Sequence, residues 1–163
     1  MAEYTHVTHT FEPVYDETSQ VLILGTFPSV KSREQNFYYG HPQNRFWRVV
    51  AVVCGCAVPA TVEEKKEMLL QEHIAVWDVI ESCDITGSSD ASIRNVKVND
   101  IGRILTAAPK IRIFANGAKA YELYRKYMQS AAGREAVRLP STSPANAACG
   151  MEKLCEAWRG IKG

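Results

Sequence analysis

The asparagine in the segment FYYGHPQNRFWRVV, residues 37–50, is the first candidate for chemistry. Pro42 suits the first turn of a helix, so the sequence predicts a helix over 42–53 with Asn44 inside that turn. An amide there is out of place as a core residue. It either caps backbone groups of the helix or faces a pocket, and the sequence leaves both readings open.

A second set of candidates follows four short apolar runs, VLILG (21–25), HIAVWDVI (73–80), KIRIFANG (110–117) and AVRLP (136–140). Small hydroxyl residues and glycines there let a backbone approach a bulky ligand and supply N–H and O–H donors to phosphate. In any one loop these residues could merely form a turn. Four such loops at one edge favour a binding site, formed by Gly25, Thr26, Pro28, Ser29, Ser32, Asp78, Asn116, Gly117, Ser141, Thr142, Ser143 and Asn146.

The elements that position these residues alternate along the chain. The four apolar runs are typical of strands buried on both faces, and helical patterns separate them. Such alternation predicts one α/β domain over 1–163, with a parallel sheet and helices on both faces. Ligands of such sheets bind at the carboxyl ends of the strands. We interpret 82–99 as a long loop and predict helices over 42–53, 61–71, 99–107, 118–131 and, capped by Asn146, 147–158.

Composition limits the class of protein. The chain has 163 residues, of which 46% are hydrophobic and 23% charged, with a net charge of +1. These values are typical of one compact domain. No apolar run is long enough to span a membrane, and no signal-peptide pattern is present. We therefore expect a cytoplasmic monomer, whose near-neutral charge still permits a local basic groove.

Metal and cofactor chemistry is not indicated. Cys54 and Cys56 lie too close together for the usual zinc or iron–sulfur spacing, and five scattered cysteines are typical of a reducing compartment. His6 and His9 are interpreted as part of a solvated N-terminal tail. The loop GTFPSVKS lacks the ending of a phosphate-binding P-loop, and the dinucleotide fingerprint and a nucleophile elbow are also absent. We expect no metal and no cofactor.

Two of these motifs carry a family resemblance. LGTFPSVKSREQNFYYGHPQNRFWRVV resembles the first motif region of the uracil-DNA glycosylase superfamily, and LPSTSPAN is similar to its last motif, a loop that penetrates DNA. WDVIESC, SSDASI and FANGAKA also fit the hypoxanthine-DNA glycosylase branch. The resemblance covers nearly the whole chain and implies a three-layer α/β/α sandwich around a four-stranded parallel sheet.

The resemblance implies a function: cleavage of the N-glycosidic bond of a deaminated base, hypoxanthine, that is flipped out of DNA to leave an abasic site. Phe37, Tyr38 and Tyr39 could then stack on the base, and Gly40 would let the backbone pass close to it. Each aromatic ring could equally plug the core. Residues of the last motif would grip the DNA backbone and fill the gap left by the base: Ser141, Thr142, Ser143, Pro144, Ala145 and Asn146.

The chain departs from better-known members of the superfamily at Phe27. Those members carry an Asp or Asn at the matching position, where it orients the attacking water, whereas Phe27 reads as a wall of the base pocket. The resemblance implies that Asn44 holds the water instead. Donors after Gly25 and the Asn116 side chain would stabilise the departing base. No lysine stands out as a nucleophile, so a monofunctional enzyme is expected.

Base choice depends on Asp78, which aligns with the base-reading Asn of uracil-specific relatives. A carboxylate accepts a hydrogen bond from a ring N–H but cannot donate one to a ring oxygen, so it pairs with half of the hypoxanthine edge. Asp78 could instead cap a helix or form a salt bridge. Two other functions stay open: a uracil- or mismatch-specific glycosylase, and a non-catalytic DNA- or nucleotide-binding domain.

Overall fold

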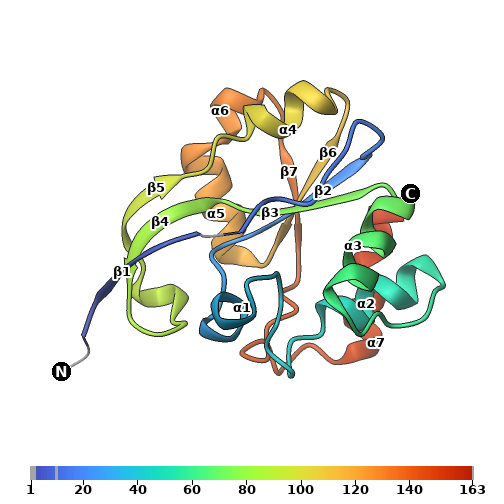
Figure 1. Cartoon of the computed structure of the whole chain (residues 1–163), viewed down its shortest axis with the longest axis horizontal. Coiled ribbons are helices and arrows are strands. Elements are labelled where there is room, and N and C mark those ends of the chain that lie inside the picture. Colours follow the sequence, from blue (N-terminus) through green and yellow to red (C-terminus); the bar gives the residue numbers. More distant parts are fainter. Residues whose placement is uncertain (1–2, 10, 163) are drawn as a thin grey trace.

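The centre of the molecule is a four-stranded parallel sheet, which confirms the predicted fold class. The computed structural model describes residues 3–9 and 11–162 (Figure 1). The strands occur in the order β3-β2-β6-β7 and all run in the same direction. Their bounds are Val21–Gly25 (β2), Ile74–Asp78 (β3), Arg112–Asn116 (β6) and Ala136–Leu139 (β7).

Strands β2 and β3 are continuous apolar runs because helices or loops cover both of their faces. Every residue of these two strands is buried. The α-helices are Val30–Gln35 (α1), Phe46–Cys54 (α2), Val62–Gln71 (α3), Gly102–Ala107 (α4), Ala118–Tyr127 (α5), Gln129–Ala132 (α6) and Met151–Trp158 (α7). Figure 1 shows α2, α3 and α7 gathered on one side, whereas α5 packs against β6 and β7.

The direction of the crossovers determines where a ligand can enter. The chain moves from β2 to its neighbour β3 through α1, α2 and α3, and from β6 to β7, in the opposite direction, through α5 and α6. The connections therefore diverge on either side of the β2–β6 pair. In a doubly wound sheet such a switch point opens a crevice at the carboxyl ends of the two strands. Here those ends are Gly25 and Asn116.

The predicted loop over 82–99 is wrong, because residues 82–85 and 94–98 belong to a second sheet. Strands β1 (Thr5–Thr8), β4 (Ile80–Ile85) and β5 (Arg94–Val98) form an antiparallel sheet in the order β1-β4-β5, with a short 3₁₀ turn, Asp90–Ser92, between the last two. Strand β5 is an edge strand with largely exposed polar residues, which makes its sequence read as a loop.

The predicted solvated tail is wrong for His9, whereas His6 is exposed as expected, with 64% of its side chain accessible. His6 lies in β1 and bonds Asp84 at 2.9 Å, while only 2% of the His9 side chain is exposed. The pairing of β1 with β4 brings this segment to the sheet, and the His9 amide donates to the carbonyl of Glu81 at 2.6 Å. Partners distant in sequence bury a histidine that its polar neighbours would leave in water.

Three predicted helix boundaries require correction. The helix expected at Pro42 begins at Phe46, because residues 41–44 form a turn in which the Asn44 amide bonds the His41 carbonyl at 3.0 Å. The helix expected after Asn146 begins at Met151, after a turn closed by a bond from the Asn146 amide to the Ser143 carbonyl. The helix expected over 118–131 is divided into α5 and α6.

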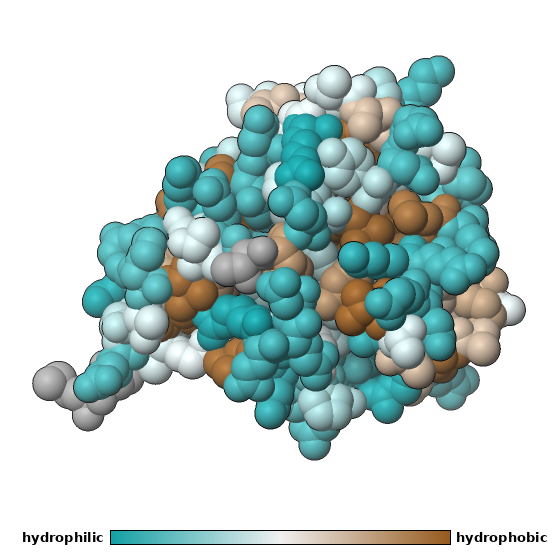
Figure 2. All heavy atoms as spheres, in the orientation of Figure 1, coloured by the Kyte–Doolittle hydropathy of each residue, from teal (hydrophilic) through white to brown (hydrophobic). Residues whose placement is uncertain are grey.

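The surface in the view of Figure 2 is mainly hydrophilic, with apolar groups in separate places. The exposed large hydrophobic side chains among the described residues come from different elements: Tyr4, Val30, Val52, Val58, Tyr127 and Val137. Isolated apolar groups of this kind are normal on a protein surface. None of the described helices is long and apolar enough to cross a membrane.

Candidate functional site

A cavity of about 380 Å³ opens at the switch point of the central sheet. Its walls come from the segments that follow β2, β3, β6 and β7, together with the turn before α2 and the β4–β5 connection. The lining residues are Gly25, Thr26, Phe27, Pro28, Ser29, Ser32, Tyr38, Tyr39, His41, Asn44, Asp78, Ser88, Asp90, Asn116, Ser141, Thr142, Ser143, Pro144 and Ala145.

Four of the predicted site residues do not line this cavity: Phe37, Gly40, Gly117 and Asn146. Gly40 lies against α1, where its amide donates to the Ser32 hydroxyl at 2.9 Å and a Cβ would come within 2.6 Å of Gln35 Oε1. Close backbone approach is therefore required there by the helix, and not by a ligand in the cavity. Asn146 supports the last loop, since its side-chain amide donates to the Ser141 carbonyl at 3.0 Å.

The floor of the cavity contains a buried carboxylate. Asp78 ends β3, and its Oδ2 accepts a hydrogen bond of 2.9 Å from His9 Nε2. Both side chains are at least 95% buried. Asn99 fixes the backbone beside them, because its side-chain amide donates to the carbonyls of Asp78 and Ile80. Besides base reading, a helix cap and a salt bridge were open for Asp78, and the structure shows the contact with His9, which is an ion pair only when the imidazole is protonated.

Gly25 makes room for this carboxylate. A Cβ at position 25 would lie 2.4 Å from Asp78 Oδ1 and 2.9 Å from the Tyr39 hydroxyl oxygen, distances that real Cβ atoms do not tolerate. The strand therefore has to end in glycine for both polar groups to reach the same part of the cavity.

The three consecutive aromatic residues occupy different places. Tyr38 is 2% exposed, and its hydroxyl donates to the Glu12 carbonyl at 3.0 Å, so most of its ring belongs to the core. Phe37 is also buried and does not line the cavity. Tyr39 has a left-handed backbone conformation, with φ of 52°, and its ring stacks on Phe46 at a centroid distance of 4.0 Å.

The Tyr39 hydroxyl is an unusual group. Its oxygen atom is buried, and none of the described residues forms a hydrogen bond of ordinary geometry with it. Burial and the charge of Asp78 raise the pKa of Tyr39, whereas hydrogen bonding from the nearby Asn116 side chain lowers it. That interaction supplies a donor to the oxygen atom, so the hydroxyl hydrogen itself still lacks an acceptor.

Asn116 is tied to the last loop in both directions. Its Nδ2 donates to Thr142 Oγ1, and its Oδ1 accepts from the Thr142 amide, each at 3.0 Å. Thr142 is fully buried. These two hydrogen bonds hold the beginning of the last loop against β6. The second Nδ2–H group of Asn116 takes part in neither of them.

Asn44 combines both roles that its position allows. Its Oδ1 accepts from the Phe46 amide at 2.9 Å, so it caps the start of α2, while the residue also lines the cavity. A carbonyl oxygen has two lone pairs, and the second is available to a water molecule.

Arg45 joins this segment to the last loop. Its backbone amide donates to the Thr142 carbonyl at 3.1 Å, and its guanidinium group reaches the carbonyls of Ser143, Asn146 and Cys149 at 3.4, 3.1 and 2.5 Å. The role of Arg45 is not evident from the sequence, because an arginine beside a helix start is normally expected to be a charged surface residue. A planar donor that serves several carbonyls is what fixes an irregular loop.

Three further lining residues were missed, His41, Ser88 and Asp90, whereas Ser32 lines the cavity as predicted. Ser88 and Asp90 come from the β4–β5 connection, which the motif SSDASI marks but which the loop interpretation left without a position. Asp90 lies at the exposed rim, where desolvation of its carboxyl group and the nearby Asp78 raise its pKa to about 6, against the opposing effect of Lys119.

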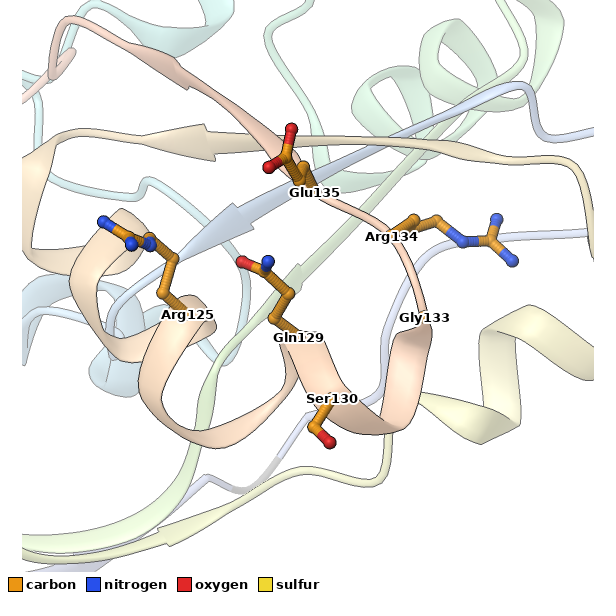
Figure 3. Close-up of a pocket in the computed structure, with 6 residues that line it drawn as sticks. All are labelled: Arg125, Gln129, Ser130, Gly133, Arg134 and Glu135. Carbon is orange, nitrogen blue, oxygen red and sulfur yellow. The ribbon is translucent and has the colours of Figure 1, made fainter.

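A second, shallow hollow of about 500 Å³ lies near the other end of the sheet, between α5, α6 and the start of β7 (Figure 3). Its two arginines differ: Arg125 and Glu135 extend over the hollow, while Arg134 points away and donates to the Ile111 carbonyl at 2.7 Å. Loop residues from the carboxyl ends of the strands do not reach this hollow. The cavity at the switch point is therefore the candidate site.

Comparison with known proteins places the chain in a family. The family model of the uracil DNA glycosylase superfamily matches residues 12–162. A hypoxanthine DNA glycosylase from Methanosarcina acetivorans is 38% identical over 138 residues, which are 83% of this chain and 86% of that protein. A hypoxanthine DNA glycosylase from Methanosarcina barkeri is 33% identical over the same shares.

A solved structure supports the same family assignment. The solution NMR structure of a candidate uracil DNA glycosylase from Methanosarcina acetivorans superposes with a TM-score of 0.78 at 34% identity. The match covers 94% of this chain and 97% of that one. The chain belongs to the uracil DNA glycosylase superfamily.

The Arg45 contacts predict how the last loop is stabilised. Arg45→Met retains much of the aliphatic stem but removes the hydrogen bonds to three loop carbonyls. We expect the free energy of unfolding to fall by about 1.5–3 kcal/mol, the usual contribution of a hydrogen bond to a charged group. Hydrogen exchange of residues 141–149 should accelerate. Arg48→Met, at an exposed position on α2, is the control. Unchanged exchange in Arg45→Met would show that the loop keeps its conformation without the clamp.

The raised pKa of Asp90 predicts a pH-dependent stability. The folded protein binds a proton at Asp90 more tightly than the unfolded chain, so this group stabilises the fold below about pH 4, and the contribution is lost as the pH rises through about 6. Asp90→Asn should remove this dependence. Urea unfolding of both proteins from pH 4 to 7 should show the wild type losing stability relative to the variant. Parallel pH curves would contradict the assignment.

Proposed function

We propose that this protein is a monofunctional DNA glycosylase that hydrolyses the N-glycosidic bond of hypoxanthine in DNA and leaves an abasic site. The observation that carries the proposal is the buried Asp78 carboxylate in the floor of a cavity at the switch point, at the position where a base would be read. The volume of the cavity lies in the range of about 300–1,000 Å³ that is typical of small-molecule sites. Both curated relatives named above support the same substrate.

The cavity can hold a base only after the nucleotide leaves the helical stack. In this proposal Phe27 forms an apolar wall, and the stacked Tyr39 ring forms part of another. Asp78 Oδ1 accepts a hydrogen bond from the N1–H group of hypoxanthine, while Oδ2 is engaged by His9. Thr26 and Gly25 line the cavity together with Asp78.

The chemistry requires a positioned water and support for two developing charges. As the C1′–N bond breaks, positive charge grows on the sugar and negative charge on the base. Asn44 Oδ1 holds the water in line with the bond, because its bond to the Phe46 amide fixes the side chain. The second Nδ2–H group of Asn116, which the bonds to Thr142 do not use, turns in this proposal from Tyr39 to the departing base and stabilises its charge.

The DNA contacts come from two loops in this proposal. Pro28 and Ser29 precede α1, and the Ser29 hydroxyl already caps that helix. Ser141, Thr142 and Ser143 lie beside the backbone of the damaged strand. Pro144 and Ala145, on the loop that Asn146 supports, fill the gap that the base leaves. Arg45 keeps this loop rigid, which lowers the entropic cost of insertion.

The reaction as proposed uses no metal and no cofactor, since every step is assigned to side chains and water. The described residues contain no group of three His, Cys, Asp or Glu side chains that could hold a metal ion. All five cysteines are free thiols, which fits action in a reducing compartment such as the cytoplasm. The proposed cavity is built from one chain, so a monomer suffices for activity.

A substrate panel tests the proposed function. Otherwise identical duplexes carry inosine, deoxyuridine or an undamaged base, and alkali after incubation converts each abasic site to a strand break. We expect breakage at inosine, and none with adenine in its place. Cleavage at uracil alone would replace hypoxanthine as the substrate. Intact strands throughout, together with retained duplex binding, would indicate a binding domain without glycosylase activity.

Asn44→Ala tests the role of the amide. Loss of the cap should cost about 0.5–2 kcal/mol of stability. Excision should suffer more, because a group that positions the nucleophile acts chiefly in the transition state. By analogy with a lost oxyanion donor we expect a fall in the single-turnover rate on the order of a hundredfold or more. Duplex affinity should be nearly unchanged.

A matched control separates capping from catalysis. Thr61→Ala removes another side-chain cap, since the Thr61 hydroxyl accepts from the Glu64 amide at 3.1 Å at the start of α3, outside the cavity. It should lose similar stability and keep its excision rate. Near-normal excision by Asn44→Ala would assign the water to another group, and Asn116→Ala would be the next variant to measure.

A further inference from the structure

The hypoxanthine edge presents two complementary groups. Its N1–H is a hydrogen-bond donor, and the adjacent O6 is an acceptor. Asp78 can satisfy only the N1–H half, because an ionised carboxylate has no proton to donate. A flipped base whose O6 stayed unpaired in a dry cavity would lose the hydrogen bonds that it had with water. The site therefore requires a donor next to Asp78 Oδ1.

The Tyr39 hydroxyl is placed to be that donor. The position that a Cβ would occupy on Gly25 lies 2.9 Å from the Tyr39 hydroxyl oxygen and 2.4 Å from Asp78 Oδ1, so the two polar atoms lie close to one point beside Gly25, which lines the cavity. The hydroxyl oxygen is buried, and its hydrogen has no acceptor among the described residues. An unpartnered buried donor beside an acceptor matches a ligand that offers an acceptor and a donor side by side.

We propose that Tyr39 is a specificity-determining residue, which donates its hydroxyl hydrogen to O6 of the flipped hypoxanthine while Asp78 Oδ1 accepts from N1–H. The inference rests on the function proposed above and adds the second half of base recognition to it.

Both partners are held in place before a base arrives. The Tyr39 ring lies on Phe46 with an interplanar angle of 18°, and the left-handed backbone at Tyr39 sets the direction of the side chain. His9 occupies Asp78 Oδ2, which leaves Oδ1 toward Gly25. The raised pKa of Tyr39 keeps the hydroxyl protonated at any physiological pH, so it remains a donor. Such preorganisation lowers the cost of binding.

The Asp78 carboxylate also explains how an undamaged base is rejected. Adenine presents the reverse pattern, with an acceptor at N1 and a donor amine at position 6. In the same orientation its N1 lone pair faces the Asp78 carboxylate, which repels it, whereas the Tyr39 hydroxyl can rotate to accept from its amine. Rejection of adenine therefore rests on Asp78, because sites built on hydrogen bonds discriminate strongly against analogues that leave them unpaired.

Tyr39→Phe tests the inference, because it removes one oxygen atom and keeps the ring on Phe46. The probes are two duplexes with cleavage-resistant 2′-fluoro-arabino nucleosides, one of hypoxanthine and one of purine, which has neither O6 nor the N1–H group and so can contact neither Tyr39 nor Asp78 in the proposed way. We expect affinity for the hypoxanthine duplex to fall about tenfold to a hundredfold, and affinity for the purine duplex to stay unchanged. Single-turnover excision of ordinary inosine should fall by at least the same factor.

Tyr124→Phe is the matched control. Its hydroxyl is likewise buried, but it donates to the Arg134 carbonyl at 2.6 Å, ahead of β7 and at the opposite end of the sheet from the cavity. This variant should lose stability and keep its preference for hypoxanthine over purine. A general effect of losing a buried hydroxyl is thereby separated from loss of contact with O6.

The outcomes distinguish this inference from the proposed function. If the wild type excises inosine and Tyr39→Phe weakens both duplexes equally or neither, the Tyr39 contact is overturned while the glycosylase assignment stands. If the wild type leaves inosine intact in the alkali assay, the proposed substrate is wrong and the inference falls with it. A selective loss at the base that carries O6 supports both.

Discussion

The organisation of the candidate site depends on the small space beside Gly25. Any side chain at the end of β2 would collide with Asp78 Oδ1 and approach the Tyr39 hydroxyl. Because glycine leaves this space open, two polar groups from distant parts of the chain face one point in an otherwise packed interior. The carboxylate also needs compensation there, since an unpaired buried charge is costly. His9 provides this compensation through its hydrogen bond to Asp78. The pairing of β1 with β4 in the second sheet brings His9, which follows β1, close to Asp78.

In the proposed mechanism the turn before α2 holds the attacking water, since Phe27 in the cavity wall has no polar group that could hold it. Asn44 lies on the turn that also presents Arg45 to the last loop. The residue proposed to hold the water and the loop proposed to enter DNA are therefore parts of one hydrogen-bonded unit. The proposal thus couples the position of the loop to the position of the nucleophile through adjacent residues.

Much of this architecture follows from local sequence. The run at 21–25 predicts a buried strand because its apolar residues are continuous, and the loops after the strands could be assigned to one edge because parallel strands end together. The run at 136–140 is an exception to burial, since β7 lies at the edge of the sheet and exposes Val137 and Arg138. Asp78 and Asn116 were found from the strand ends and Asn44 from its place at a helix start, and all three line the cavity.

The features that could not be predicted depend on contacts distant in sequence. His9 looks solvated until β1 pairs with β4, and Arg45 looks like a surface charge until its three carbonyl partners, about a hundred residues away, are in place. Strand β5 has exposed polar residues because it lies at an edge, so its pattern resembles a loop. The helix predicted to begin at Pro42 begins only at Phe46, because proline is as common in a turn as in the first turn of a helix.

The most direct test of base recognition is the position of the base itself. A crystal structure of the Asn44→Ala variant with an inosine-containing duplex would retain the uncleaved nucleotide. The account predicts hypoxanthine beside Gly25, with N1 about 3 Å from Asp78 Oδ1 and O6 about 3 Å from the Tyr39 hydroxyl oxygen. A base stacked in the duplex, or turned so that another edge meets Asp78, would contradict it.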